Sequence, residues 1–367
     1  MARIIYGVAG EGYGHSSRSH MIGQHLIDLG HDVIFAASRK SYSYLRQYFG
    51  EQVKEIMGMS LVYDHCRLRH VKTFFTNAGA FLGGGHTKNT QLYENEFKRF
   101  RPDFVITDFE PFSAWWAWRN NVPFISIDHE HFLTHCRIEH TGDWFARLNS
   151  TAVTRLYYFG AAAYIIINFF SVPTKNKATI LAPPVVRPVV CSMNPEKGED
   201  IIIYSTDKTA KAQLLEAFKQ FPGQKFVIYG FDEDSEDKNC LFKKTSTEGF
   251  LADLAGCRGV IATAGFSLIS ECLYFKKRML LLPVIGQYEQ TVNSHYIQRL
   301  GLGMWSKRLD KDVLSTYLTS LDEPVSQNSQ IIWPDNAKFF EILEDTLRKV
   351  NCPANSESVR CDISAVS

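Results

Sequence analysis

Short runs of β-branched residues alternate with segments of helical periodicity along most of this chain. Such a run suits a strand buried on both faces, and a helix between two of them carries the chain back across the sheet. The alternation therefore predicts parallel, doubly wound sheets. In the first half of the chain, the expected strands are residues 3–8, 31–36, 104–107, 124–127 and 164–169.

The alternation is interrupted once, near the middle of the chain. Residues 181–188 contain three prolines, and proline continues neither a helix nor a central strand. A chain of 367 residues also exceeds the size at which one core usually keeps growing. The sequence thus predicts two Rossmann-like α/β domains, 1–183 and 184–335, facing each other across a cleft. In the second, strands are expected at 200–204, 225–229, 259–263 and 279–282.

The C-terminal segment is expected to lie outside both domains. Apolar residues at helical spacing predict an amphipathic helix at 336–350, and a return of this helix to the N-terminal domain is one arrangement it permits. Residues 351–367 lack periodicity and are expected to form a disordered tail.

Composition excludes several classes of function. The formal net charge is +1, so the chain has no overall basic field for nucleic acid. The eight cysteines form no CxxC pair, which disfavours a zinc ribbon or a disulfide framework and fits a reducing compartment. The N-terminal apolar run is too short for a signal peptide, and the apolar stretch 156–170 is too short to span a bilayer.

We therefore expect a cytoplasmic protein. Aromatic residues at 115–118 and 144–145 leave peripheral contact with the inner face of the membrane open. The acidic run 232–234 is interpreted as a solvated loop because its neighbours are also charged or polar, and no metal site is expected. The oligomeric state is left open by the sequence.

A glycine-rich loop follows the first expected strand and opens a helix. Its spacing is GxGxG, whereas a dinucleotide fingerprint needs GxGxxG and a later acidic residue, so NAD is disfavoured and Arg39 suggests NADP only weakly. Gly12 and Gly14 let the backbone approach a substrate. His15 stands at the helix start, where the helix N-terminus is expected to lower its pKa and keep it neutral. It is a candidate base, with helix capping as the structural alternative.

A carboxylate partner for His15 is expected at the end of a neighbouring strand. Asp108 ends the expected strand 104–107, and the carboxyl ends of parallel strands share one edge of a sheet. A carboxylate there could fix the imidazole tautomer and stabilise the imidazolium. Asp108 could equally cap the next helix, and Glu110 competes for the role.

A second strand, small-residue loop and helix occur in the C-terminal half, at residues 259–275. The loop at Gly265 exposes backbone N–H groups at a helix N-terminus, which suits a diphosphate. Glu271 follows on the same helix and could reach ribose hydroxyls, although a buried structural glutamate is the alternative. After the next strand, Glu289, Gln290 and Asn293 provide groups that hydrogen-bond sugar hydroxyls.

Together these motifs resemble those of the GT-B glycosyltransferases, such as MurG and the UDP-glycosyltransferases, and of a microbial glycosyltransferase-like family without an assigned acceptor. The resemblance spans nearly the whole chain, and its most specific part is 263–271 followed by Pro283 and 289–293. Thr263 departs from the histidine that many plant-type relatives carry there.

The resemblance implies a role for each matching position. His15 would be the catalytic base and Asp108 its supporting aspartate, while Glu271 would bind the ribose. Glu289, Gln290 and Asn293 would bind the donor sugar. The turn after the first strand of the second domain, Ser205 and Thr206, would contact the phosphates. So would the small-residue loop, which consists of Ala264, Gly265, Phe266 and Ser267. Phe250 and Leu251 would border the uracil.

The function implied is that of an inverting glycosyltransferase without an obligatory metal cofactor. A UDP-sugar would be the donor, and a hydroxyl of a cell-surface glycan, a glycolipid or a small molecule would be the acceptor. Loops at 73–90 and 129–144 would bind this acceptor, whose identity they do not reveal. A UDP-sugar 2-epimerase and a non-catalytic nucleotide-sugar-binding subunit are the alternatives, with an NADP oxidoreductase a distant fourth.

Overall fold

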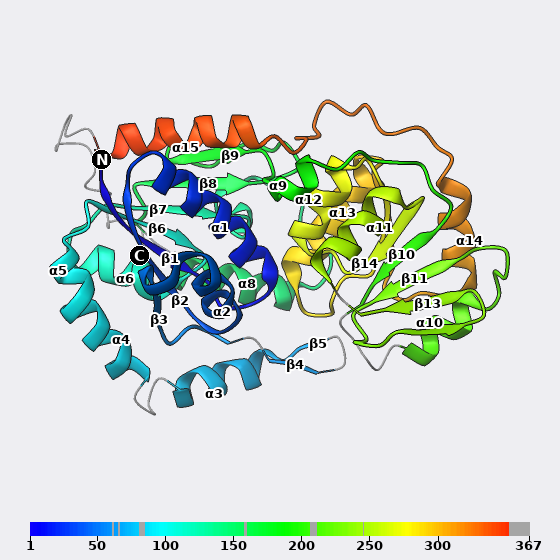
Figure 1. Ribbon diagram of the computed structural model, residues 1–367, viewed down its shortest axis with the longest axis horizontal. Coiled ribbons are helices and arrows are strands. Elements are labelled where there is room, and N and C mark those ends of the chain that lie inside the picture. The colour runs from blue at the N-terminus through cyan, green and yellow to red at the C-terminus, as the bar shows by residue number, and fades with distance from the viewer. Residues whose placement is uncertain are drawn as a thin grey trace.

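The computed structural model describes residues 1–60, 62–64, 67–80, 85–157, 160–205, 211–244 and 246–351. It has two seven-stranded sheets that lie one after the other along the long axis of the molecule (Figure 1). The expectation of two doubly wound α/β units is confirmed. The predicted donor residue Thr206 and residues 352–367 of the predicted tail lie outside the described residues.

The first sheet is entirely parallel, with strand order β3-β2-β1-β6-β7-β8-β9. Four of its strands are buried throughout or nearly so, as expected of a sheet covered on both faces. All five predicted strands are present. The short β3 and β9 were not predicted, and β9 continues the sheet into the first two residues of the expected interruption. The strands are β1 (Arg3–Val8), β2 (Asp32–Ala37), β3 (Val53–Glu55), β6 (Phe104–Asp108), β7 (Phe124–Asp128), β8 (Ala163–Ile167) and β9 (Thr179–Ala182).

The second sheet has the order β12-β13-β11-β10-β14-β15-β16 and is parallel except for the β12–β13 pair. All four predicted strands are present, and β12, β13 and β16 were missed. The strands are β10 (Ile201–Tyr204), β11 (Phe226–Tyr229), β12 (Ser235–Asp237), β13 (Cys240–Lys243), β14 (Gly259–Ala262), β15 (Arg278–Leu281) and β16 (Gly303–Trp305); β4 (Tyr63–Asp64) and β5 (Arg67–Leu68) form a separate hairpin.

Helices connect the strands in both units. None of the described helices is long and apolar enough to cross a membrane. The helices are α1 (Tyr13–Asp28), α2 (Arg39–Phe49), η1 (Gly50–Gln52), α3 (His70–Ala80), α4 (His86–Leu92), η3 (Tyr93–Phe97), α5 (Lys98–Phe100), α6 (Pro111–Arg119), α7 (Phe132–His135), α8 (Trp144–Tyr157), α9 (Pro188–Cys191), α10 (Lys211–Phe218), α11 (Thr247–Gly256), α12 (Phe266–Tyr274), α13 (Tyr288–Arg299), α14 (Lys311–Ser320) and α15 (Asn336–Asn351).

The last helix, α15, returns to the first sheet. It lies along β8 and β9 (Figure 1) and inserts Phe339 and Leu343, which are fully buried. We therefore call the first sheet, its helices and α15 the first lobe, and the second sheet with its helices the second lobe. The chain crosses between the lobes twice, before β10 and before α15.

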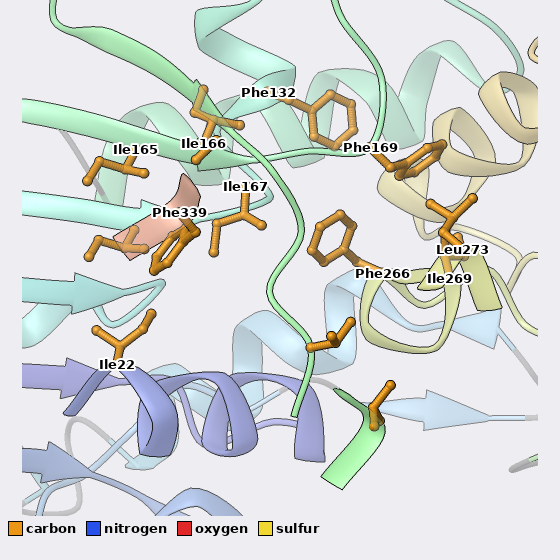
Figure 2. Close-up of a cluster of buried hydrophobic side chains, with 14 of the residues drawn as sticks. Ile22, Phe132, Ile165, Ile166, Ile167, Phe169, Phe266, Ile269, Leu273 and Phe339 are labelled. Carbon is orange, nitrogen blue, oxygen red and sulfur yellow. The ribbon is translucent and has the colours of Figure 1, made fainter. Parts of the chain in front are cut away.

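One hydrophobic cluster runs through both lobes. Phe132 and Phe169 come from the first lobe, and Phe266 and Ile269 come from α12 of the second (Figure 2). The ring centroids of Phe169 and Phe266 are 6.4 Å apart. Because apolar packing continues across the boundary, the carboxyl ends of the strands in the two sheets are held facing the same space.

Candidate active site

A cleft of about 2380 Å³ lies between the lobes and is lined from both sides. In the first lobe it borders the loops after β1, β6 and β7, and in the second the loops after β11, β14 and β15. In each sheet the strand order reverses direction at the central strand, next to β6 or β14. Open α/β sheets bind ligands at such switch points. Gly12, Gly14 and His15 all line this cleft.

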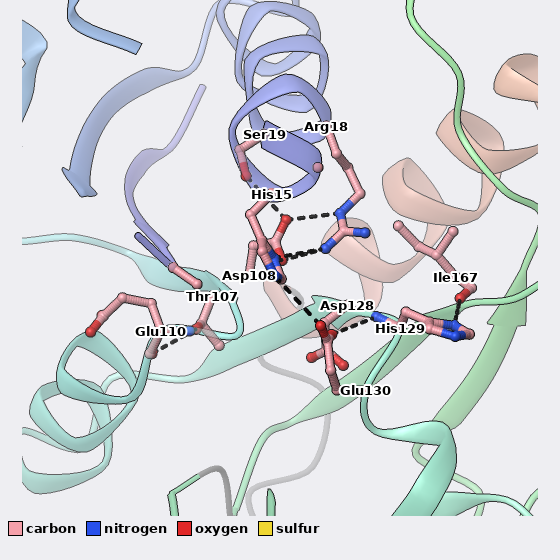
Figure 3. Close-up of polar contacts among 12 residues, drawn as sticks. His15, Arg18, Ser19, Thr107, Asp108, Glu110, Asp128, His129, Glu130 and Ile167 are labelled. Carbon is pink, nitrogen blue, oxygen red and sulfur yellow. Dashed lines mark hydrogen bonds and ion pairs between the residues drawn. The ribbon is translucent and has the colours of Figure 1, made fainter. Parts of the chain in front are cut away.

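His15 and Asp108 meet at the switch point of the first sheet. Gly12 precedes α1 with a φ of 76°, a conformation that suits glycine, and the turn places His15 in the first turn of the helix. The His15 Nδ1 is 2.8 Å from Asp108 Oδ1 (Figure 3). The predicted convergence of these two residues at one edge of the sheet is observed.

Asp108 is fully buried and is held by three side chains of α1. Arg18 donates from Nε to Oδ2 at 2.8 Å and from Nη2 to Oδ1 at 2.5 Å, and Ser19 donates to Oδ2 at 3.1 Å (Figure 3). Burial raises the pKa of Asp108, but the positive charges of Arg18 and His15 outweigh it, so the net pKa lies below its ordinary value. Asp108 is therefore ionised and accepts a hydrogen bond from His15 Nδ1–H.

The expected lowering of the His15 pKa is wrong. Burial does lower it, but the carboxylates of Asp108 and Glu130 outweigh burial, and the net pKa is raised above 6.5. Glu130 lies on the side of the ring opposite Asp108, with its Oε1 3.5 Å from His15 Nε2. Two nearby anions have a larger effect than the half charge of a helix N-terminus.

Glu110 does not compete for His15. Its two carboxylate oxygens accept hydrogen bonds from Phe112 N at 2.8 Å and Ser113 N at 2.7 Å, so it caps α6. Burial raises its pKa to about 7. The capping role that Asp108 could have taken belongs to Glu110, since the N-cap position of α6 is two residues beyond the end of β6.

The N-terminus of α12 faces the N-terminus of α1 across the cleft. Gly265 is the N-cap of α12, and Gly265, Phe266 and Ser267 line the cleft. A side chain on Gly14 would place its Cβ 2.2 Å from Ser267 Oγ. The two helices can approach this closely only because position 14 is glycine. Free backbone N–H groups from both helices therefore point toward one region, which favours an anion.

Glu271 lies on the cleft side of α12 and forms an ion pair with Arg187, from the segment that joins the lobes. Arg187 Nε and Nη2 are 2.8 and 2.7 Å from the same oxygen, Oε1. Burial raises the pKa of Glu271, and the Arg187 charge opposes this effect. The predicted alternative was a structural glutamate whose carboxylate is fully hydrogen-bonded within the protein. Both Arg187 contacts go to Oε1, so this alternative holds for Oε1 and not for Oε2.

The polar cluster of α13 is present, but only part of it faces the cleft. Glu289 and Gln290 line it, whereas Asn293 is fully buried. Asn293 Nδ2 donates to Glu289 Oε1 at 3.2 Å, and its Oδ1 is 2.9 Å from Nε2 of His129, which follows β7 of the other lobe. Burial raises the pKa of Glu289 to about 8. Gln290 Oε1 accepts from Val284 N at 3.0 Å.

The remaining predicted donor residues divide into two groups. Phe250 lines the cleft, whereas the neighbouring Leu251 is fully buried in the core. Ala264 is also buried, and its carbonyl oxygen accepts from Asn293 Nδ2 at 3.2 Å. Ser205 follows Tyr204, which lines the cleft, and its backbone N donates to Tyr229 O at 3.2 Å. Among the described residues, no cluster of three or more His, Cys, Asp or Glu side chains could hold a metal ion.

Sequence comparison places this chain in a known family. The family model "Glycosyl transferase family 1" matches residues 2–322, which is most of the chain. The chain belongs to glycosyl transferase family 1. It is therefore a glycosyltransferase, an enzyme that transfers a sugar from a nucleotide-sugar donor. A search of curated protein sequences found no significant match.

Solved structures similar to this glycosyltransferase have the GT-B fold. The glycotransferase of kitacinnamycin has 14% identity and a TM-score of 0.63, over 95% of this chain and 96% of that one. Phytolacca americana UGT2, complexed with UDP-2-fluoro-glucose and pterostilbene, has 12% identity and a TM-score of 0.61, over 96% and 100%. Acinetobacter baumannii MurG has 10% identity and a TM-score of 0.57, over 94% and 99%. The expected GT-B fold is confirmed.

Arg18 and Arg187 were not predicted as site residues, and His129 and Glu130 were expected only as part of the acceptor-binding loop 129–144. Arg18 lies three residues after His15 on α1, and helical spacing alone would have placed the two side by side. His129 and Glu130 follow β7 as Asp108 ends β6, so the same strand-end argument applies to them. Arg187 lies between prolines of the connecting segment, where no periodicity indicates its direction.

Proposed function

We propose that this glycosyltransferase is an inverting enzyme that transfers a sugar from a UDP-sugar to a hydroxyl group of its acceptor. The observation that supports this most strongly is the His15–Asp108 pair, which lies beside the N-terminus of α12 at the cleft. Direct displacement of the diphosphate by an acceptor hydroxyl requires a base on one side of the cleft and an anion-binding group on the other. In this proposal residues 1–183 bind the acceptor and residues 184–335 bind the donor.

His15 Nε2 takes the proton of the acceptor hydroxyl while Nδ1–H donates to Asp108. The acceptor oxygen forms a bond to the anomeric carbon, the bond from that carbon to the diphosphate breaks, and UDP leaves. Attack from the face opposite the leaving group inverts the configuration. Backbone N–H groups at Gly265 and Phe266 stabilise the charge that develops on the diphosphate.

The donor is assigned to the second lobe. Glu271 accepts hydrogen bonds from ribose hydroxyls through Oε2, and Phe250 borders the base. Glu289 and Gln290 bind the sugar, whereas the buried Asn293 acts from behind by orienting Glu289. UDP is chosen because of the sequence resemblance and because the similar Phytolacca americana enzyme was solved with a UDP-sugar analogue. Closure of the lobes over these groups would keep water from the anomeric carbon.

The test is the His15→Ala variant, assayed with a panel of UDP-sugars and hydroxyl acceptors. Wild type should release UDP and form a glycoside of inverted configuration, and the variant should lose transfer by about 100-fold or more while binding UDP as before. Chromatography of the products also separates transfer from 2-epimerisation, which would return an altered UDP-sugar without using an acceptor. Turnover retained by His15→Ala would overturn the assignment of the base.

A further inference from the structure

Arg187 is the feature of the cleft that the proposed function leaves unused. It precedes the short helix α9 in the segment that connects the two lobes, and its side chain is largely buried. Both of its contacts with Glu271 go to one oxygen, Oε1. Among the described residues, neither Arg187 Nη1 nor Glu271 Oε2 has a hydrogen-bond partner. The pair thus has one donor group and one acceptor oxygen left to offer a ligand.

The free ends of this pair lie beside the helix termini. A small cavity is bordered by Arg187, Glu271, Ser267 of the first turn of α12, and Gly14 and Ser17 of α1. Helical side chains lean toward the N-terminus of their own helix, so Glu271 and the guanidinium bound to it are directed to the first turn of α12. Arg187 therefore lies next to the backbone N–H groups that the proposed function gives to the diphosphate.

The negative charge of a bound diphosphate calls for a cationic side chain beside the N-terminus of α12. A nucleoside diphosphate leaving group carries at least two negative charges, and a helix N-terminus contributes only about half a positive charge. Arg18 also borders the small cavity, but its guanidinium already binds both oxygens of Asp108. Arg187, with a planar guanidinium and a free Nη1, has the geometry that binds phosphate oxygens.

We propose that Arg187 is a donor-binding residue that contacts the diphosphate while it holds Glu271 for the ribose. The inference rests on the proposed donor site and adds a residue and a specificity to it. Because one side-chain pair carries both groups, it recognises ribose and diphosphate as a unit. The enzyme should therefore prefer nucleoside diphosphates strongly over nucleosides, and Arg187 should account for much of that preference.

Isothermal titration of UDP and uridine tests the inference without any acceptor. Arg187→Gln should weaken UDP binding by about tenfold or more, as expected for a lost charge-assisted hydrogen bond, and Arg187→Lys should lose less. Arg258→Gln is the matched control. Arg258 is similarly buried and pairs with Asp322, but it precedes β14 and so lies at the sheet edge opposite the cleft. It should bind UDP as wild type does.

A second background separates contact with phosphate from support of Glu271. In a Glu271→Gln protein no carboxylate remains to be held, so Arg187→Gln should still weaken UDP about fivefold or more and leave uridine unchanged. If it leaves UDP unchanged there, Arg187 only positions Glu271 and the inference is overturned. If wild type binds none of UDP, dTDP and GDP, the proposed function fails and the inference with it. Unfolding curves of each variant confirm that it is folded.

Discussion

At the scale of single residues, His15 is the group whose behaviour depends most on its neighbours. Asp108 fixes one ring nitrogen, and Glu130 lies 3.5 Å from the other. Both anions favour the imidazolium, so the base is protonated to a higher pH than an ordinary histidine. Since only the neutral ring accepts a proton, transfer should increase as the pH rises through this raised pKa.

Glu130→Gln should lower the pKa of His15, because it removes an anion that favours the charged ring. The acidic limb of the pH–rate profile should then move to lower pH. NMR titration of histidine labelled at Cε1 measures the pKa directly, with His15→Ala to assign the signal. Glu94→Gln, which removes an exposed carboxylate on η3, is the control and should leave the titration unchanged. An unaltered His15 pKa in Glu130→Gln would contradict this account.

Arg18→Met should destabilise the folded protein by about 3–5 kcal/mol at pH 7, because it leaves the fully buried Asp108 without its guanidinium. Urea unfolding measures the difference. The Asp108 pKa is lowered in the folded state, so its stabilising effect exists above the ordinary aspartate pKa and is lost as the pH falls. Asp108→Asn removes the buried negative charge that Arg18→Met leaves without its guanidinium. The double variant Arg18→Met/Asp108→Asn should therefore be more stable than Arg18→Met alone. A double variant less stable than the single would refute the pairing.

Sequence alone could place His15 and Asp108 together because both follow from one rule, that parallel strands end at one edge. It could not give the sign of the His15 pKa shift, since that depends on Glu130, which approaches from a third strand. It also could not show that Leu251 and Asn293 are fully buried. Neighbouring positions on one helix differ in which side faces the cleft, and only the packing of that helix decides it.

At the scale of elements, the close approach of α1 and α12 depends on Gly14. Gly14→Ala should lower transfer by about tenfold or more, because its methyl group would lie 2.2 Å from Ser267 Oγ and push the helix ends apart. In Gly14→Ala/Ser267→Ala that oxygen is gone and the next atom, Ser267 Cβ, is 3.3 Å away, so the double variant should recover much of the activity. Failure of this rescue would show that position 14 acts in another way.

The control for this experiment is Gly256→Ala. Gly256 is the last residue of α11, outside the proposed acceptor and donor groups, and among the described residues no contact lies within 4 Å of an added Cβ, so the substitution should leave transfer intact. Steady-state rates of all four proteins at saturating donor provide the comparison. The contrast isolates the crowding at position 14 from the general effect of replacing a helical glycine.

The elements that the sequence predicted are strands buried on both faces and helices with a clear apolar period. Strands such as β6 and β7 are continuous apolar runs, and α15 has a clear helical period. The missed strands of the two sheets have three or four residues each, too few to show a period, and they lie at or next to the edges of the sheets. They are β3, β9, β12, β13 and β16. Their pairing is decided by the neighbouring strand rather than by their own residues.

At the scale of the whole molecule, His129 joins the lobes next to the site. Its ring stacks on Phe266 with centroids 3.9 Å apart, its Nε2 is 2.9 Å from Asn293 Oδ1, and its Nδ1 is 2.9 Å from Ile167 O. Both residues of the second lobe that it touches adjoin the proposed donor groups. Figure 3 shows the His129 ring held against Ile167 at the end of β8.

This contact makes the stability of the molecule depend on pH in a defined range. Burial lowers the pKa of His129 to about 4, whereas in the unfolded chain it titrates near 6.5. As the pH falls from about 6.5 to about 4, His129 becomes protonated in the unfolded state but stays neutral in the folded state, so the free energy of unfolding decreases. At about 1.4 kcal/mol per pKa unit, the decrease reaches about 3 kcal/mol.

His129→Gln should remove that share of the pH dependence, because glutamine can donate to Asn293 and does not titrate. Urea unfolding at pH 7 and pH 4.5 measures it, with the variant showing a smaller difference between the two values than wild type. His135, whose pKa burial also lowers to about 4, should retain its own share in both proteins. An equal difference in variant and wild type would mean that His129 is not sequestered between the lobes, and that they separate before the molecule unfolds.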